Sequence, residues 1–96
     1  MILNDFEIVS LYHARNEQAV EITQKQYGAY CHTVSMNILN SQPDAEECVN
    51  DTWVAAWNTM PPKWPQSLCG YLGKLVRNIS LNRLKALRRE KRNASL

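Results

Sequence analysis

Three of the four prolines in this 96-residue chain lie within residues 61–65, in the stretch MPPKWPQS of residues 60–67. Proline fixes φ and has no N–H, so this stretch cannot be helical throughout. A second break, NSQPD, occupies residues 40–44. Elsewhere the apolar residues recur every three or four positions, the period of an α-helix, and no segment sustains alternation with period two. We therefore expect one domain, residues 1–96, folded as a compact all-α bundle of about four helices.

The helix boundaries are predicted from capping residues beside the two breaks. Asn4 followed by Glu7 resembles a capping box, while Asn16, Asp44 and Ser67 are predicted N-caps of the later helices. The expected helices span residues 4–14, 17–40, 44–58 and 67–92.

Two packing features follow from these helices. Phe6, Val9 and either Tyr12 or His13 fall on one face of the first helix, which we expect to be buried. Gly28 lies inside the second helix, where it costs about 1 kcal/mol relative to alanine. Its presence there indicates close packing against another helix.

The net charge of +2 conceals a division between the two parts of the chain. Residues 1–60 carry a net charge of −6, whereas residues 61–96 carry +8. Such an asymmetry is typical of proteins that bind nucleic acid.

The last expected helix has a core face and a basic face. Apolar residues from Leu68 to Ile79 share one side, and a polar, mainly basic stripe lies opposite. The stripe comprises Lys74, Arg77, Asn78, Lys85, Arg88, Arg89 and Arg92. It could neutralise phosphates and read base edges. The alternatives are a solvated face favoured by the helix dipole, an acidic protein groove, or an acidic membrane, which the lack of Phe or Trp beyond Tyr71 disfavours.

Trp64 lies between prolines, immediately before this basic helix. Its ring either packs back over the core or offers a surface on which an unstacked base could stack. The final turn, residues 88–93, is either helical in the free chain or ordered only when DNA binds.

No feature of the sequence indicates catalysis, a cofactor or a metal site. There is no nucleophile with a base in motif context, no glycine-rich phosphate loop and no metal-ligand cluster. Cys31, Cys48 and Cys69 form no CxxC pair, which favours buried thiols in a reducing cytoplasm. MILNDFEIVS lacks the features of a secretory signal, and no apolar run approaches the ~20 residues of a membrane span. We expect a non-enzymatic cytoplasmic protein that does not associate with membranes.

Two motifs resemble region 2 of bacterial RNA polymerase sigma factors of the sigma-70 family. PDAEECVNDTWVAAWN, residues 43–58, resembles the pattern DAEDlvQevFlkaW. GYLGKLVRNISLNRLKALRREKR, residues 70–92, resembles wLyriarNlalDhlRrrrR, which follows after a short variable loop. The likeness spans about residues 7–92 and is closest to the small extracytoplasmic-function type. The chain departs from the patterns at Asn50, Trp53, Tyr71 and Asn82.

The resemblance implies that the third helix docks on the clamp helices of the largest subunit of core RNA polymerase. Its acidic and polar face would steer and orient a basic partner. The residues expected to bind polymerase are Asp44, Glu47, Asn50, Asp51, Val54 and Asn58.

The resemblance also implies that the loop and the basic helix bind the non-template single strand of the promoter −10 element. The loop would help to open the duplex and hold a flipped base. The residues expected to bind DNA are Trp64, Lys74, Arg77, Asn78, Asn82, Arg83, Lys85, Arg88, Arg89 and Arg92. Asn78 and Asn82 are the expected base readers, and the arginines of the last turns the expected phosphate contacts. Arg83 lies toward the core side, so a pairing between helices is its alternative role.

Sigma factors of this type also carry a C-terminal helix-turn-helix domain that reads the −35 element. We expect the chain, which ends at Leu96, to be an excised region 2 domain or a fragment. Two other functions stay open: a helical regulator that reads duplex DNA, and a protein-interaction module bound by an acidic partner such as an anti-sigma factor.

Overall fold

The computed structural model describes residues 3–94, and the side chains of residues 3–92. This part of the chain contains four helices and no strand, which confirms the predicted all-α bundle. The helices are α1 (Asp5–His13), α2 (Gln18–Leu39), α3 (Gln42–Thr59) and α4 (Leu68–Ala94).

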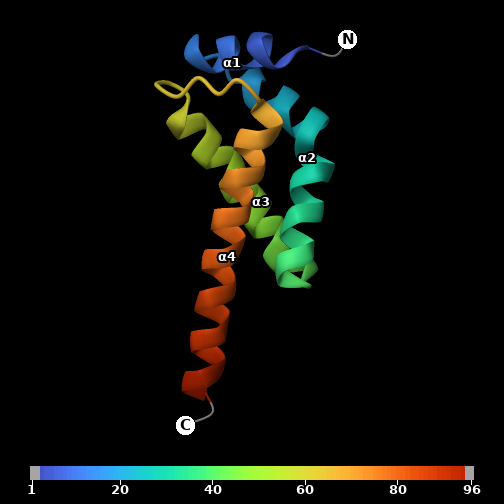
Figure 1. Cartoon of the computed structure of the whole chain (residues 1–96), viewed down its shortest axis with the longest axis vertical. Helices are drawn as coiled ribbons and strands as arrows, with labels where there is room; N and C mark the ends of the chain where they lie inside the picture. The colour runs from blue at the N-terminus through green and yellow to red at the C-terminus, as the bar shows by residue number, and fades with distance from the viewer. Residues whose placement is uncertain (1–2, 95–96) are drawn as a thin grey trace.

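The molecule is elongated because α4 extends beyond the neighbouring helices (Figure 1). α4 packs against both α2 and α3, which also pack against each other. α1 crosses one end of this bundle, next to the loop between α3 and α4. With 27 residues, α4 is about 40 Å long, and its last turns project past the ends of α2 and α3. The final turn is helical in this structure, through Ala94.

The core gathers side chains from all four helices. Its fully buried members include Ile8, Val9, Tyr12, Cys31, Ala56, Met60, Leu68, Leu72 and Val76. Complete burial of a large apolar side chain contributes about 1.5–3 kcal/mol. The predicted burial of Val9 and Tyr12 is confirmed. The prediction for Phe6 is wrong, because its side chain is 67% exposed and Ile8 fills the core instead.

Two predicted helix caps are confirmed. The Glu7 N–H donates to Asn4 Oδ1 at 2.8 Å, and the Asn4 N–H donates to Glu7 Oε1 at 3.2 Å, which completes the capping box. At the start of α4, Ser67 Oγ accepts from the Gly70 N–H at 3.1 Å.

Two other predicted caps are wrong. Ser41, not Asp44, is the N-cap of α3, because Pro43 fits the first turn, where its missing N–H costs nothing. Glu17, not Asn16, is the N-cap of α2, and its side chain makes no capping bond. Asn16 still contributes from one position earlier, since its Oδ1 accepts from the Gln18 N–H at 3.0 Å.

The predicted close packing at Gly28 is also wrong. A Cβ at Gly28 would have no heavy atom within 4 Å outside its own helix backbone. The close approach lies instead at Gly73 of α4, where a Cβ would be 2.5 Å from the Tyr30 hydroxyl of α2. A bare backbone at Gly73 therefore lets Tyr30 lie against α4.

Asp5 joins three helices through its carboxylate. Its Oδ2 accepts from the Leu68 N–H at 2.9 Å, which caps the first turn of α4. Its Oδ1 accepts from the Tyr27 hydroxyl of α2, and this bond raises the pKa of Tyr27 to about 12. The carboxylate thus fixes the start of α4 relative to α1 and α2.

Arg15 performs the matching role at the end of α3. Its Nη1 donates to the carbonyls of Trp57 and Met60 at 3.0 and 2.9 Å, which satisfies acceptors that the helix end leaves free. Its guanidinium carbon lies 3.7 Å from the Trp57 ring centroid. Arg15 has φ of 56°, a left-handed conformation, in the turn between α1 and α2.

Candidate nucleic-acid interface

The loop of residues 60–67 is anchored at several points. Met60 is fully buried, and the Lys63 N–H donates to the Thr59 carbonyl at 2.9 Å. The carbonyl of Lys63 lies 2.9 Å from His13 Nε2, within hydrogen-bond distance of α1. These contacts hold the loop against α1 and the end of α3.

Trp64 lies on α1. Its ring centroid is 4.2 Å from that of His13 and 5.5 Å from that of Phe6, both on α1. The side chain is nevertheless 45% exposed. Each of its two predicted roles is therefore sterically possible: the ring packs on the body of the domain and still offers surface to a ligand.

The exposed side of Trp64 borders an open hollow of about 360 Å³, which we call the Trp64 hollow. Its lining residues are Lys63, Trp64, Pro65, Tyr71, Lys74, Leu75 and Asn78. The Tyr71 hydroxyl donates to Thr59 Oγ1 at 2.6 Å, which restricts the orientation of its ring. The structure thus brings three predicted DNA-binding residues, Trp64, Lys74 and Asn78, to one cavity.

The basic stripe of α4 begins at this hollow. Of the ten residues predicted to bind DNA, all except Arg83 are exposed. Within residues 3–92, no ion pair engages Lys74, Arg77, Lys85, Arg88, Arg89 or Arg92. From Lys74 to Arg92 the stripe is about 27 Å long, at 1.5 Å per helical residue. Its positive charge is therefore available to a polyanion.

The projecting end of α4 carries a second basic cavity. An open hollow of about 490 Å³ is lined by Lys85, Arg88, Arg89 and Arg92. Such a concentration of like charge favours phosphate groups, whose binding would release counterions. It lies at the opposite end of α4 from the Trp64 hollow.

Arg83 forms an ion pair within the molecule. Its Nη2 and Nε donate to Asp44 Oδ1 at 2.9 and 3.2 Å, and Glu47 Oε2 lies 3.7 Å from Nη2. The alternative role predicted for Arg83, a pairing between helices, is confirmed. Asp44 is consequently turned toward α4, away from the exposed face of α3.

The other predicted polymerase contacts share one exposed face of α3. Glu47, Asn50, Asp51, Val54 and Asn58 recur at spacings of three and four, and each is exposed. Val54 is an apolar side chain with 58% exposure on this otherwise polar face. This pattern is typical of a contact surface with an apolar centre and a polar rim.

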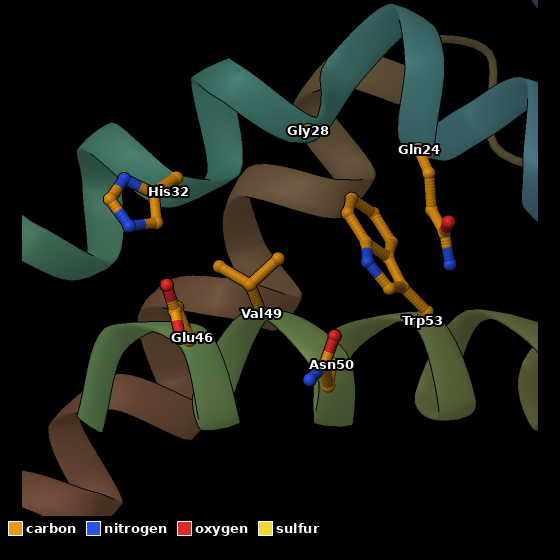
Figure 2. Close-up of a pocket in the computed structure, with 7 residues that line it drawn as sticks. All are labelled: Gln24, Gly28, His32, Glu46, Val49, Asn50 and Trp53. Carbon is orange, nitrogen blue, oxygen red and sulfur yellow. The ribbon is translucent and has the colours of Figure 1, made fainter. Parts of the chain in front are cut away.

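A groove that the sequence pattern did not predict lies between α2 and α3 (Figure 2). Its first part, the Gly28 hollow, has a volume of about 330 Å³ and is lined by Gln24, Gly28, His32, Glu46, Val49, Asn50 and Trp53. A second part of about 350 Å³ shares three of these residues and extends along Val20, Val54 and Trp57. The signal was the four-residue spacing of Gln24, Gly28 and His32, which places them on one stripe of α2.

The three cysteines are free thiols. Cys31 and Cys48 are buried as predicted, whereas Cys69 is only partly buried. Burial raises the pKa of Cys31 to about 11, which disfavours a reactive thiolate. Across the described part of the chain, no group of three or more His, Cys, Asp or Glu side chains could hold a metal ion. Among the same residues, no helix combines the length and apolar character needed to cross a bilayer.

No family model, no curated protein and no solved structure matches this chain.

Proposed function

We propose that this chain is a region 2 domain of a sigma-70-type transcription initiation factor, of the extracytoplasmic-function type. In this role it binds the clamp helices of core RNA polymerase. It also recognises the non-template strand of the −10 element and helps to keep it unpaired. The proposal includes a cytoplasmic location and no catalytic step in this chain.

One observation carries the DNA-binding part of the proposal. Trp64, Lys74 and Asn78 line a single hollow at the start of a basic stripe about 27 Å long. An aromatic face, a cation and an amide are the groups that bind a flipped base by stacking, charge and edge hydrogen bonds. The exposed cations that follow along α4 suit the phosphates of the same strand.

The polymerase-binding part rests on the exposed face of α3. Glu47 and Asp51 present negative charge beside Val54, and basic residues of a partner helix would complement them. Because Asp44 and Arg83 bind each other, we no longer include Asp44 among the proposed polymerase contacts or Arg83 among the proposed DNA contacts. Arg83 holds α4 in place and positions the stripe.

Binding to labelled oligonucleotides at several salt concentrations tests the DNA-binding part. We expect a single-stranded 20-mer pool to bind more tightly than the same sequences as duplex. With about four phosphate contacts, log K should fall against log salt with a slope of about −3.

The same measurement separates the alternatives. A preference for duplex would indicate a double-strand regulator instead of a sigma domain. Binding that does not weaken as salt rises would exclude phosphate contacts and favour an interaction module. Co-elution of the chain with purified bacterial core RNA polymerase tests the second half of the proposal independently.

A further inference from the structure

One position that lines the Gly28 hollow, Gly28 itself, has no side chain. A Cβ built there would meet nothing within 4 Å, although Gly28 is in the middle of a 22-residue helix. Glycine is unfavourable at such a position. Neither backbone conformation nor internal packing explains it, since Gly28 has no positive φ and no close neighbour.

His32 contributes an unpaired polar atom to this hollow. Its Nε2 is buried and has no hydrogen-bond partner within the described residues. In Figure 2 the ring extends from α2 toward α3, on the side of Glu46 and Val49. Buried polar atoms without partners are rare, so this nitrogen is free to bond to a polar group that enters the hollow.

The remaining walls specify the chemistry of that partner. Val49 and Trp53 provide apolar surface, and Glu46 places an exposed carboxylate at the rim. A lysine or arginine side chain combines an apolar stem with a cationic end and matches both features. The exposed acids Glu47 and Asp51 on the same helix also favour a basic partner.

We infer that the Gly28 hollow receives a lysine or arginine side chain from a partner helix. The stem of that side chain packs on Val49 and Trp53, and its cationic end binds the Glu46 carboxylate and donates to His32 Nε2. The identity of the partner, core RNA polymerase, rests on the proposed function. The docking surface then includes the α2 stripe of Gln24, Gly28 and His32 as well as the exposed face of α3.

The first test fills the hollow. Gly28→Leu places a side chain where the incoming one would lie, whereas Ala29→Leu adds the same side chain at an exposed neighbouring position outside the hollow. Affinity for purified bacterial core RNA polymerase is measured by biolayer interferometry. We expect a loss of at least tenfold for Gly28→Leu and less than twofold for Ala29→Leu.

Two further variants keep the test independent of folding. Glu46→Lys changes an exposed charge and should weaken polymerase binding at least tenfold. His32→Phe keeps a ring but removes Nε2, and should weaken binding about three- to tenfold. Single-stranded oligonucleotide binding, which uses α4, should stay within twofold of wild type in both variants and so shows that the domain is folded.

The outcomes distinguish this inference from the proposed function. Wild-type affinity in Gly28→Leu and Glu46→Lys would overturn the inference while leaving the proposed function standing. If the wild-type chain itself failed to bind polymerase, the polymerase part of the function and this inference would both fall.

Discussion

Arg83 on α4 donates from Nη2 and Nε to the same carboxylate oxygen of Asp44 on α3, at 2.9 and 3.2 Å. These hydrogen bonds and that of the Ser41 hydroxyl lower the pKa of Asp44 below its ordinary value. The pair joins the first turn of α3 to α4. It therefore fixes the direction of the basic stripe.

Asp44→Asn should reduce the pH dependence of stability in acid. Because the folded-state pKa of Asp44 is lowered, its contribution is fully present above the unfolded value of about 3.9. It is lost as pH falls through the folded-state value. The stability of wild type should therefore fall between about pH 5 and pH 2 more steeply than that of Asp44→Asn. Urea unfolding across this range measures the difference.

Asp51→Asn is the matched control for this experiment. Asp51 is also on α3, but it is exposed and makes no ion pair within residues 3–92. Equal acid sensitivity of wild type and Asp44→Asn would contradict the role assigned to the Arg83 pair.

Asp5→Ala should destabilise the domain by about 1–3 kcal/mol. The change removes the acceptor of the Leu68 N–H and of the Tyr27 hydroxyl, both partly buried bonds. The control is Glu17→Ala, since Glu17 is an exposed acid whose side chain makes no capping bond. Thermal unfolding followed by circular dichroism should show a lower midpoint temperature for Asp5→Ala than for Glu17→Ala. Similar midpoints in the two variants would contradict the role of Asp5 in joining α1, α2 and α4.

Gly28 and Gly73 should respond differently to replacement by alanine. Gly28→Ala should stabilise the domain by up to about 1 kcal/mol, because the new methyl group has space and alanine favours the helix. Gly73→Ala should stabilise less or destabilise, because Tyr30 must move to admit the methyl group. Urea unfolding of both variants and of Gly73→Ala with Tyr30→Ala measures this. A penalty for Gly73→Ala that persists in the double variant would contradict the assigned contact.

Trp64→Ala should weaken single-strand binding while leaving most of the core intact. Loss of one base–aromatic stack costs about 1–3 kcal/mol, a factor of roughly 5 to 150 in affinity. Tyr30→Ala is the control, as an exposed aromatic outside the Trp64 hollow. Fluorescence anisotropy with a labelled oligonucleotide gives both affinities. An unchanged affinity in Trp64→Ala would leave the ring with a packing role on α1 only.

Arg88→Gln and Asn78→Ala should affect binding in different ways. Arg88 lines the terminal basic hollow, so its loss should weaken all sequences alike and reduce the salt slope by about 0.7. Asn78 lines the Trp64 hollow, so its loss should reduce sequence preference more than affinity. Competition between defined oligonucleotides across a salt series separates the two effects. An equal loss of affinity for all sequences in both variants would mean that Asn78 only positions the strand.

Local chemistry made much of the fold predictable. The Asn4–Glu7 capping box, the Ser67 cap and the proline-rich break all depend on residues within four positions of each other. The two wrong caps also have local causes. Glu17, next to Asn16, is the N-cap of α2, and Pro43 in the first turn moves the start of α3 from Asp44 to Ser41.

Contacts between distant residues were not predictable from the pattern. Asp5 caps α4 from 63 residues away, and no local signal distinguishes it from an ordinary first-turn acid. A single glycine likewise does not reveal what lies opposite it, which is why Gly28 was misread and Gly73 overlooked. The position of Arg83 toward the core side was predictable, because the angle of a residue around its own helix depends only on its place in the sequence of that helix.

Sequence selection by the polymerase-bound chain tests the central claim most directly. Core RNA polymerase carrying this chain is mixed with random single-stranded and random duplex DNA pools, and bound molecules are sequenced. We predict a short motif enriched from the single-stranded pool, with at least one position losing its preference in Trp64→Ala or Asn78→Ala. Enrichment from the duplex pool alone, or a single-strand motif unaffected by both substitutions, would contradict the account.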